Sequence, residues 1–376
     1  MRLAGNLGAG RIQLDKVIPA IKKANEGAKD PMFAIFGGEP LQIPRLVLER
    51  LWGFGLETYK KNGIQTNGEL IDDDFIRLFV KYRVQVGISI DGPWPLNAAR
   101  SNKDGTEKTL KAIEKVRAAG IWPALHVILS KYNARGERLA ELIKWIKSLE
   151  GVITEVRFHL LEVDTYKAHE VSLTSEENQA AYLALSKVET QTVLQPFKDM
   201  TKLLQGLPFE KKVTDDPKDT SKDVGCTWNG CDPYTTPAVQ GVDGDGTLSN
   251  CGRTNKDGVA YRKSSHGGSE RVLTLYNTVY EAGGCKGCRY FFACKGQCPG
   301  EAIGGDWRNR STHCRTYFNT FQSIEDRVGT IHPDKIKEYE RQVLDGVSAP
   351  GSHGDSHGDT DHSDRTFIRV PVVVKK

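Results

Sequence analysis

The stretch Cys285–Cys298 reads CKGCRYFFACKGQC, and it brings four cysteines close together in the chain. Two residues separate Cys285 from Cys288, five more precede Cys294, and another three precede Cys298. A C-x2-C turn lets two thiolates converge on one metal centre. The spacing therefore predicts a metal-binding region, and the fold must hold several thiols around one point.

The other cysteines lie on both sides of this stretch. The chain contains eight cysteines, all between Cys226 and Cys314, and residues 1–225 contain none. The remaining four are Cys226, Cys231, Cys251 and Cys314. Eight thiolates suit two four-thiolate sites, which hold either zinc or cubane iron–sulfur clusters. A disulfide framework is the competing interpretation, but it is typical of short secreted chains.

Length and composition narrow the class of protein. The chain has 376 residues, with 52 Lys and Arg against 48 Asp and Glu, and this net charge of +4 does not favour a nucleic-acid partner. No apolar run approaches the roughly 20 residues that span a membrane, and the segment after Met1 lacks the apolar region of a signal peptide. We expect a cytoplasmic protein with no nucleic-acid or membrane partner.

Residues 11–165 alternate between amphipathic helices and short apolar strands. The expected strands are Met32–Phe36, Gly63–Thr66, Val84–Ile90, Ala124–Leu129 and Val156–Leu161. Such alternation predicts parallel βα units. We therefore expect an α/β fold, with a partial (β/α) TIM-type barrel of five strands over residues 1–205. A capping box at Thr174–Glu177 opens a helical stretch that runs to about Leu204.

The rest of the chain divides by composition. Residues 206–225 are polar with two prolines, which is typical of a linker, and the cysteine-rich domain is expected over residues 226–325. Residues 326–376 would hold a helix at Pro333–Leu344, a low-complexity tail rich in His and Asp, and a strand-like end at Phe367–Val373. For the tail histidines, a solvated chain is favoured over a weak metal site.

Three turns follow expected strands at the edge where parallel folds bind ligands. They are Gly37-Gly38-Glu39-Pro40, Thr66-Asn67-Gly68 and Ser89-Ile90-Asp91-Gly92. Each also has a purely structural interpretation, as a tight turn or a turn cap. Arg157 and His159 on the last expected strand are further candidates to face this edge. For His126 and His159 we favour hydrogen-bonded core histidines.

The GGEP turn, the SIDGP turn and the clustered cysteines behind a partial barrel together resemble the radical S-adenosylmethionine (SAM) superfamily, in its SPASM-domain branch, which includes peptide and protein maturases. The resemblance covers about residues 11–325. The family signature C-x9–15-G-x4-C, C-x2-C-x5-C-x3-C, C is matched by Cys231, Gly246, Cys251, Cys285, Cys288, Cys294, Cys298 and Cys314. Cys226 resembles the extra upstream ligand of members with two fully ligated auxiliary clusters.

The resemblance implies cofactors and their sites. Cys226, Cys231, Cys251 and Cys298 would hold one auxiliary [4Fe-4S] cluster, and Cys285, Cys288, Cys294 and Cys314 the other. Gly37, Gly38 and Glu39 would bind the aminopropyl end of SAM, because carbonyls and a carboxylate accept hydrogen bonds from an ammonium group. Asn67 and Ser89 would contact its methionine carboxylate or ribose. The sequence predicts no individual catalytic residue.

One element of the resemblance is absent. The superfamily's C-x3-C-x2-C loop, which follows a first strand and binds the SAM-cleaving cluster, has no counterpart in residues 1–225. We therefore expect a chain that begins after that first strand, or a degenerate homologue, with SAM and a third [4Fe-4S] cluster only in an intact form.

The resemblance also implies a function and partners. The intact enzyme would modify a peptide or small-protein substrate by 5′-deoxyadenosyl-radical hydrogen abstraction, with an electron donor such as a flavodoxin or ferredoxin. The alternative is a non-catalytic iron–sulfur or zinc protein that binds a peptide or transfers electrons.

Overall fold

The computed structural model describes residues 12–26, 32–163, 166–205, 226–229, 231, 239–251, 253, 270–329 and 365–370. The predicted linker over residues 206–225, the predicted helix at Pro333–Leu344 and the histidines of the tail lie outside these residues. No described helix combines the length and apolar character that crossing a membrane requires.

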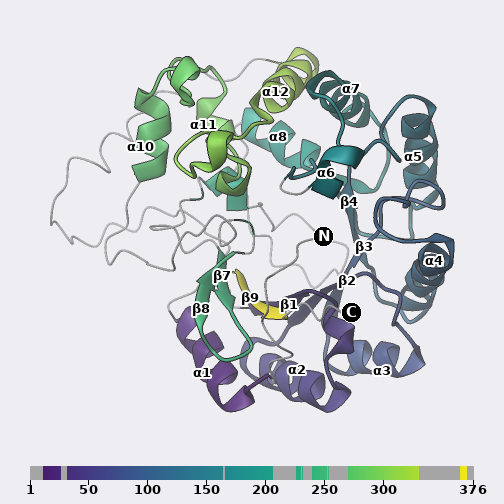
Figure 1. Ribbon diagram of the computed structural model, residues 1–376. Helices are drawn as coiled ribbons and strands as arrows, with labels where there is room; N and C mark the ends of the chain where they lie inside the picture. The colour runs from purple at the N-terminus through teal and green to yellow at the C-terminus, as the bar shows by residue number, and fades with distance from the viewer. Residues whose placement is uncertain are drawn as a thin grey trace, which may run out of the picture.

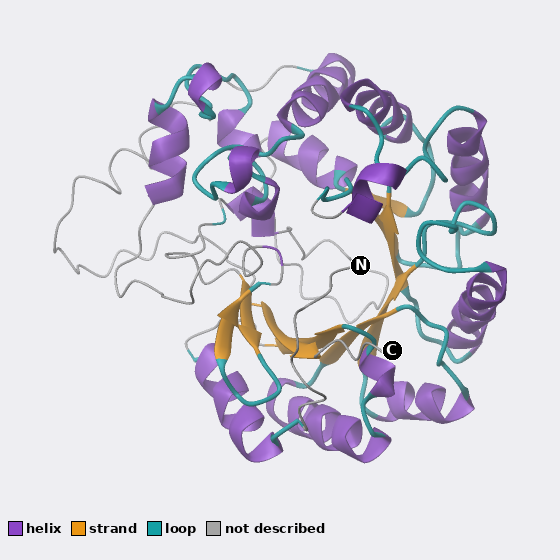
Figure 2. Ribbon diagram, viewed as in Figure 1, coloured by secondary structure: helices purple, strands orange, loops and turns teal. Residues whose placement is uncertain are grey.

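One curved sheet organises the described residues (Figures 1 and 2). Its strands run in the order β6-β5-β4-β3-β2-β1-β9-β7-β8. All neighbouring pairs are parallel except the β7–β8 hairpin. The bounds are β1 Met32–Gly37, β2 Asn62–Thr66, β3 Val84–Ser89, β4 Ala124–Ile128, β5 Glu155–His159, β6 Val193–Gln195, β7 Val239–Val242, β8 Leu248–Asn250 and β9 Arg365–Val370.

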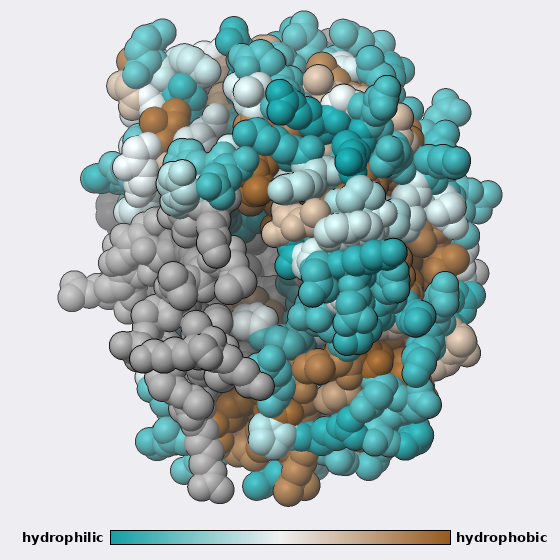
Figure 3. All heavy atoms as spheres, turned by 45° about the vertical axis from the view of Figure 1, so that its right-hand side comes forward, coloured by the Kyte–Doolittle hydropathy of each residue, from teal (hydrophilic) through white to brown (hydrophobic). Residues whose placement is uncertain are grey.

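Helices cover the convex side of this sheet, as Figure 1 shows for α2 to α5. The bounds are α1 Leu14–Ala24, α2 Arg45–Tyr59, α3 Asp73–Lys81, α4 Lys103–Ala118, α5 Glu137–Ser148, α6 Tyr166–Val171, α7 Ser175–Leu185, α8 Phe197–Leu204, α10 Glu270–Asn277, α11 Phe291–Cys294 and α12 Cys314–Val328. Together with the strands they form the predicted α/β partial barrel. Figure 3 shows one face of the molecule, where hydrophilic side chains predominate between smaller hydrophobic areas.

Helix α3 illustrates how the local sequence builds these units. Asp72 caps its first turn, because the carboxylate accepts a hydrogen bond from the backbone N–H of Phe75 at 2.9 Å. Phe75 and Phe79, one helical turn apart, are both buried toward the sheet side. Phe79 packs edge-on against Trp52 of α2, with ring centroids 5.7 Å apart. The cap and the apolar stripe together fix where α3 begins and how it faces the core.

The sequence prediction is wrong about the helical stretch that it extends to Leu204. The predicted capping box is present, with Thr174 and Glu177 bonding each other's backbone. However, α7 ends at Leu185, the chain then forms the short strand β6, and α8 begins at Phe197 after Pro196. Proline disfavours the interior of a helix, because it lacks the N–H and clashes with the preceding turn, but it is tolerated where a helix begins, as at α8. The barrel therefore contains a sixth strand, which three residues were too few to reveal.

Strand β9 occupies the edge of β1 where the sequence analysis left a first strand missing. Its backbone pairs in parallel with the whole of β1, from Met32 opposite Arg365 to Gly37 opposite Val370. On its other side β9 pairs with β7. The predicted strand at the end of the chain therefore exists, and it links the barrel to the β7–β8 hairpin.

The cysteine-rich region packs on the same body. In α12, Tyr317 meets Tyr182 of α7 edge-on at 6.0 Å between ring centroids, and Asn319 donates a hydrogen bond to Gln179. The β7–β8 turn lies against α1, where the position of a Cβ on Gly246 would be 2.8 Å from the Cβ of Lys16. Gly246, the glycine of the cysteine signature, also has a φ of 86°. Its place in the signature therefore has a packing reason.

Candidate functional site

The turn after β1 is tied to the end of β2 through Glu39. One carboxylate oxygen accepts hydrogen bonds from the Thr66 hydroxyl at 2.6 Å and from the backbone N–H of Leu41 at 3.0 Å. The other accepts the backbone N–H of Asn67 at 2.8 Å. Two carboxylate oxygens offer about four acceptor sites, so this arrangement leaves acceptor capacity for an ammonium group. Gly37 and Gly38 beside it are exposed.

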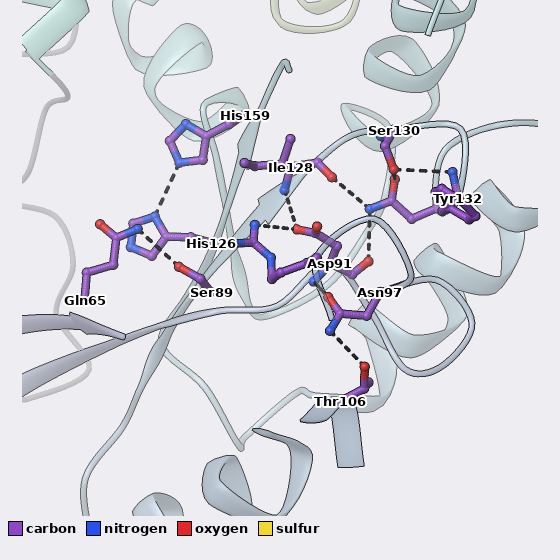
Figure 4. Close-up of polar contacts among 12 residues, drawn as sticks. Gln65, Ser89, Asp91, Asn97, Thr106, His126, Ile128, Ser130, Tyr132 and His159 are labelled. Carbon is purple, nitrogen blue, oxygen red and sulfur yellow. Dashed lines mark hydrogen bonds and ion pairs between the residues drawn. The ribbon is translucent and has the colours of Figure 1, made fainter. Parts of the chain in front are cut away.

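Ser89 lies further along the same edge, at the end of β3. It lines a cavity of about 860 Å³ on the concave face of the sheet, together with Gln65 of β2. The Gln65 amide donates a hydrogen bond to the Ser89 hydroxyl at 3.2 Å (Figure 4). The structure thus brings Glu39 and Asn67 into contact, and it places Ser89 apart from them on the cavity wall.

Asp91 stabilises the turn after β3. It is 3 % exposed, and its carboxylate accepts hydrogen bonds from the Ile128 backbone N–H at 2.8 Å and from Arg100 at 2.9 Å. Its own backbone N–H donates to Asn97. Figure 4 shows these contacts beside the cavity residues. Asp91 therefore fixes the end of β3 against β4, and through it the position of Ser89.

Two histidines face the cavity from neighbouring strands. His126 of β4 and His159 of β5 lie with their rings stacked, 5.6 Å between centroids, and Nδ1 of His126 is 3.3 Å from Nε2 of His159. On the far side, Arg253 lies 3.4 Å from Nδ1 of His159. Desolvation, and next the positive charge of Arg253, hold the pKa of His159 well below its usual value. His159 is therefore neutral at physiological pH.

A charged group also lies where the cavity meets β5. Arg157 donates a hydrogen bond to Glu155 at 3.0 Å, and both residues line the cavity. Asp199 of α8 is 5 % exposed nearby, and burial raises its pKa to about 6 although Arg157 acts in the opposite direction. The carboxyl group of Asp199 therefore titrates close to neutral pH.

The four cysteines assigned by resemblance to the second cluster meet at one place. Cys285, Cys288, Cys294 and Cys314 line a single small cavity. Burial, and next the neighbouring Cys314 and Cys288, raise the pKa of Cys285 to about 12. Burial and the other three thiols likewise hold the pKa of Cys294 well above its usual value. Bound metal reverses this balance, because a coordinating thiol loses its proton.

The donor set suits a cluster held by four thiolates. Among the described residues, no three His, Cys, Asp or Glu side chains are arranged to hold a single metal ion. Four thiols around a common cavity match the ligand set of either a zinc ion or a [4Fe-4S] cluster.

Two buried arginines tie together the backbone segments around this thiol cavity. Arg271, fully buried, donates hydrogen bonds to the backbone carbonyls of Cys231, Lys295, Gly296, Trp307 and Asn309. Arg310 lines the cavity itself and donates to the carbonyls of Tyr280 and Gly284. The loop Trp307–Arg310 carries two arginines, Arg308 and Arg310. The structure divides it: Arg310 is buried, whereas Arg308 is exposed and paired with Asp306.

The other four cysteines are described less fully. Cys226 starts a short 3-10 helix, Cys226–Asn229, and its side chain lies outside the described residues. Cys231 and Cys298 are buried and Cys251 is partly buried. Arg253, two residues after Cys251, pairs with Glu301, three residues after Cys298, at 2.7 Å. The chain segments of Cys251 and Cys298 therefore lie side by side.

Sequence reasoning missed several of these residues. Gln65 was detectable, because it lies in an expected strand two residues before the candidate Asn67. Arg253 and Arg271 carried no local signal, since their partners are distant in the sequence. His126 and His159 were expected to be hydrogen-bonded, and they are, but on the cavity wall.

Comparisons with known proteins agree with this description. Residues 8–146 match the family model of the radical SAM superfamily. An uncharacterized protein of Methanothermobacter thermautotrophicus is 26 % identical over 153 residues, which are 39 % of this chain and 56 % of that protein. The chain thus spans about half the length of this curated relative.

Solved structures share the fold. Native anSMEcpe with bound AdoMet and Cp18Cys peptide superposes with a TM-score of 0.65 and 19 % identity, over 89 % of this chain and 92 % of that chain. The same protein with Kp18Cys peptide gives 0.64 and 20 %, over 87 % and 91 %. The family model covers β1 to β4, the strands that carry Glu39, Asn67 and Ser89. Residues 8–146 thus match the model of the superfamily that the sequence resembles, and the solved structures share the fold of the chain.

Proposed function

We propose that this chain is a radical SAM-type oxidoreductase of the SPASM type that modifies a peptide or protein substrate. The observation that carries the proposal is the pairing of two sites in one body: a cavity that runs along the barrel strands and includes Ser89 at the carboxyl end of β3, and a cavity lined by four thiols. The cavity of about 860 Å³ is large enough for a cofactor and part of a substrate.

SAM would bind along the edge formed by the ends of β1, β2 and β3. The remaining acceptor capacity of Glu39 and the exposed backbone of Gly37 and Gly38 suit its ammonium group. Asn67 and Ser89 would contact the carboxylate or ribose. The peptide substrate is proposed because the similar structure anSMEcpe contains AdoMet together with a peptide.

The auxiliary clusters belong to the cysteine-rich region. Cys285, Cys288, Cys294 and Cys314 would hold one [4Fe-4S] cluster, and Cys226, Cys231, Cys251 and Cys298 the other. When bound, such clusters supply electron transfer or a substrate-binding iron. A donor such as a flavodoxin or ferredoxin would reduce them, and the reaction would take place in the cytoplasm.

The SAM-cleaving cluster does not fit the residues present. Residues 1–225 contain no cysteine, so this part of the chain offers no thiolate to such a cluster. We derive no chemical step through it. This observation favours a second candidate function, in which the chain is a non-catalytic iron–sulfur protein that binds a peptide or transfers electrons.

Anaerobic reconstitution of the chain with iron and sulfide tests both candidate functions, the oxidoreductase and the non-catalytic iron–sulfur protein. We expect about eight irons per chain, as two cubane clusters require, and binding of SAM measured by calorimetry. Two zinc ions per chain and no iron would overturn the iron–sulfur assignment. With dithionite and SAM present, release of 5′-deoxyadenosine supports the oxidoreductase. Bound SAM and reducible clusters without that product support the non-catalytic candidate.

A further inference from the structure

Each of the four cysteines that line the thiol cavity is followed directly by a basic residue. The pairs are Cys285-Lys286, Cys288-Arg289, Cys294-Lys295 and Cys314-Arg315. In contrast, Thr, Asp, Gly and Pro follow the other four cysteines, which are Cys226, Cys231, Cys251 and Cys298. The basic residues therefore belong to this one cavity and not to the cysteine-rich region as a whole.

Three of these four basic side chains reach the surface. Lys286, Arg289 and Arg315 are exposed, and Lys295 is partly buried. Arg289 pairs with the carboxylate of Glu325 at 2.5 Å. Within the part of the chain that the structure describes, neither Lys286 nor Arg315 forms an ion pair. The charges of these two residues are therefore available to a partner.

An exposed apolar pair connects the surface to the thiols. Val279 is 49 % exposed and Tyr280 is 50 % exposed. The Tyr280 hydroxyl donates a hydrogen bond to the sulfur of Cys314, to which Arg310 also donates. The guanidinium of Arg310 stacks on the Tyr280 ring, 3.6 Å from its centroid. The Tyr280 side chain therefore reaches from solvent to one of the four thiols.

The backbone holds the two available charges next to this apolar pair. The backbone N–H of Lys286 donates to the carbonyl of Thr278 at 3.0 Å, and Thr278 is the residue before the apolar pair. Arg315 directly follows Cys314, the cysteine that the tyrosine of the pair contacts. An apolar centre with a charged rim is typical of a protein–protein interface.

Positive charge exceeds negative charge on this face of the cysteine-rich region. Lys286, Arg289 and Arg315 are exposed beside one exposed carboxylate of the same segment, Glu281. Glu325 offsets the charge of Arg289. A surface of one sign steers association with a partner of the opposite sign and disfavours partners of its own sign. The chemistry of this face therefore suits an acidic protein.

We propose that Val279, Tyr280, Lys286 and Arg315 form the docking surface for an acidic electron-carrier protein. The carrier's role rests on the proposed function, in which the thiol cavity holds a [4Fe-4S] cluster, whereas the charge and the apolar centre rest on the structure alone. Among the described residues, those of this docking surface are separate from those that line the barrel cavity. The partner and the substrate thus have different places on the chain.

Calorimetry with an acidic flavodoxin and an acidic plant-type ferredoxin tests the docking surface. The anaerobically reconstituted full chain should bind at least one of them, with an affinity that falls as salt rises. Lys286→Glu and Arg315→Glu should each weaken binding roughly tenfold or more, because like charges would then face each other. Binding of neither carrier would overturn the proposal.

Arg327→Glu is the matched control, since Arg327 is an exposed arginine of the same helix, α12, and lies outside the docking surface. It should bind the carriers as the unmodified chain does. All three variants should keep the same iron content, which separates lost docking from a lost cluster. Equal binding by the Lys286 and Arg315 variants and the unmodified chain, or an equal loss in Arg327→Glu, would overturn the proposal.

The docking surface and the proposed function can fail separately. Binding that is lost in Lys286→Glu and Arg315→Glu, without release of 5′-deoxyadenosine, would contradict the oxidoreductase and leave the docking surface standing. Release of 5′-deoxyadenosine driven by the reduced carrier at an equal rate in these variants would overturn the docking surface and leave the oxidoreductase standing. Zinc in place of iron would overturn the assignment of the partner as an electron carrier.

Discussion

The carboxylate of Glu39 accepts the hydroxyl of Thr66 at 2.6 Å, which joins the turn after β1 to the end of β2. The same carboxylate also accepts the backbone N–H of Asn67. This side chain therefore holds two strand ends in register before any ligand arrives.

Glu39→Gln should weaken both the turn and SAM binding. The amide replaces one acceptor oxygen by a donor, so a backbone N–H loses its partner at a cost of roughly 1–3 kcal/mol in the free energy of unfolding. Urea unfolding and SAM calorimetry measure the two effects. Thr66→Val removes one hydrogen bond and keeps the charge, so it should lose stability with a smaller loss of SAM affinity. Unchanged stability in Glu39→Gln would contradict the structural role of the carboxylate.

Gly87→Ala should displace the His126 ring. The added Cβ would lie 3.1 Å from Nε2 of His126, and overpacking of this kind costs about 1–3 kcal/mol. Thermal unfolding measures the loss, and the His126 NMR signals should move. Gly53→Ala, in the interior of α2, is the matched control. Its added Cβ would contact only the side chain of Tyr82, at 3.7 Å. Alanine in a helix interior should stabilise that variant by up to about 1 kcal/mol.

Asp199→Asn should stabilise the protein at neutral pH. Burial raises the native pKa of Asp199 to about 6, so the folded state holds its proton more tightly than the unfolded state. That stability is fully present below the unfolded pKa of about 3.9, and it is lost as pH rises through 6. The free energy of unfolding of the variant should therefore exceed that of the unmodified protein by about 1–3 kcal/mol at pH 7, and by little at pH 4.

Urea unfolding at both pH values checks this prediction for Asp199. Asp306→Asn is the opposite control, since Arg308 lowers the pKa of that exposed carboxyl and its loss should slightly destabilise at pH 7. Equal stabilisation of Asp199→Asn at pH 4 and pH 7 would rule out the titration as the cause.

Arg310→Gln should lower the reduction potential of a cluster bound in the thiol cavity. Arg310 lines that cavity, and a positive charge near a cluster favours its reduced form. A redox titration followed by electron paramagnetic resonance measures the potential. Arg308→Gln in the same loop removes an exposed, paired arginine and should leave the potential unchanged. Equal shifts in both variants would show only a general effect of surface charge.

Local patterns in the sequence were sufficient for most of the fold. The five predicted strands are present as β1 to β5. They could be recognised as short apolar runs between helices whose apolar residues recur at helical spacing. Strand β6 was missed because three residues carry no period, and the neighbour of β9 could not be inferred because strand pairing is not a local property. Cys285 and Cys314 line one cavity although they are distant in the sequence, and Arg253 likewise reaches His159 only through the tertiary fold.

The placement of β9 between β1 and β7 has a consequence for how this molecule is made. β1 leaves the ribosome well before residues 365–370, which pair with its whole length. Until they arrive, β1 and β7 each present unpaired backbone groups, the state in which strands join the wrong partner. The barrel and the cysteine-rich hairpin are therefore joined only after residues 365–370 have been synthesised. Until then, the edges of β1 and β7 must not pair with other strands if the fold is to form.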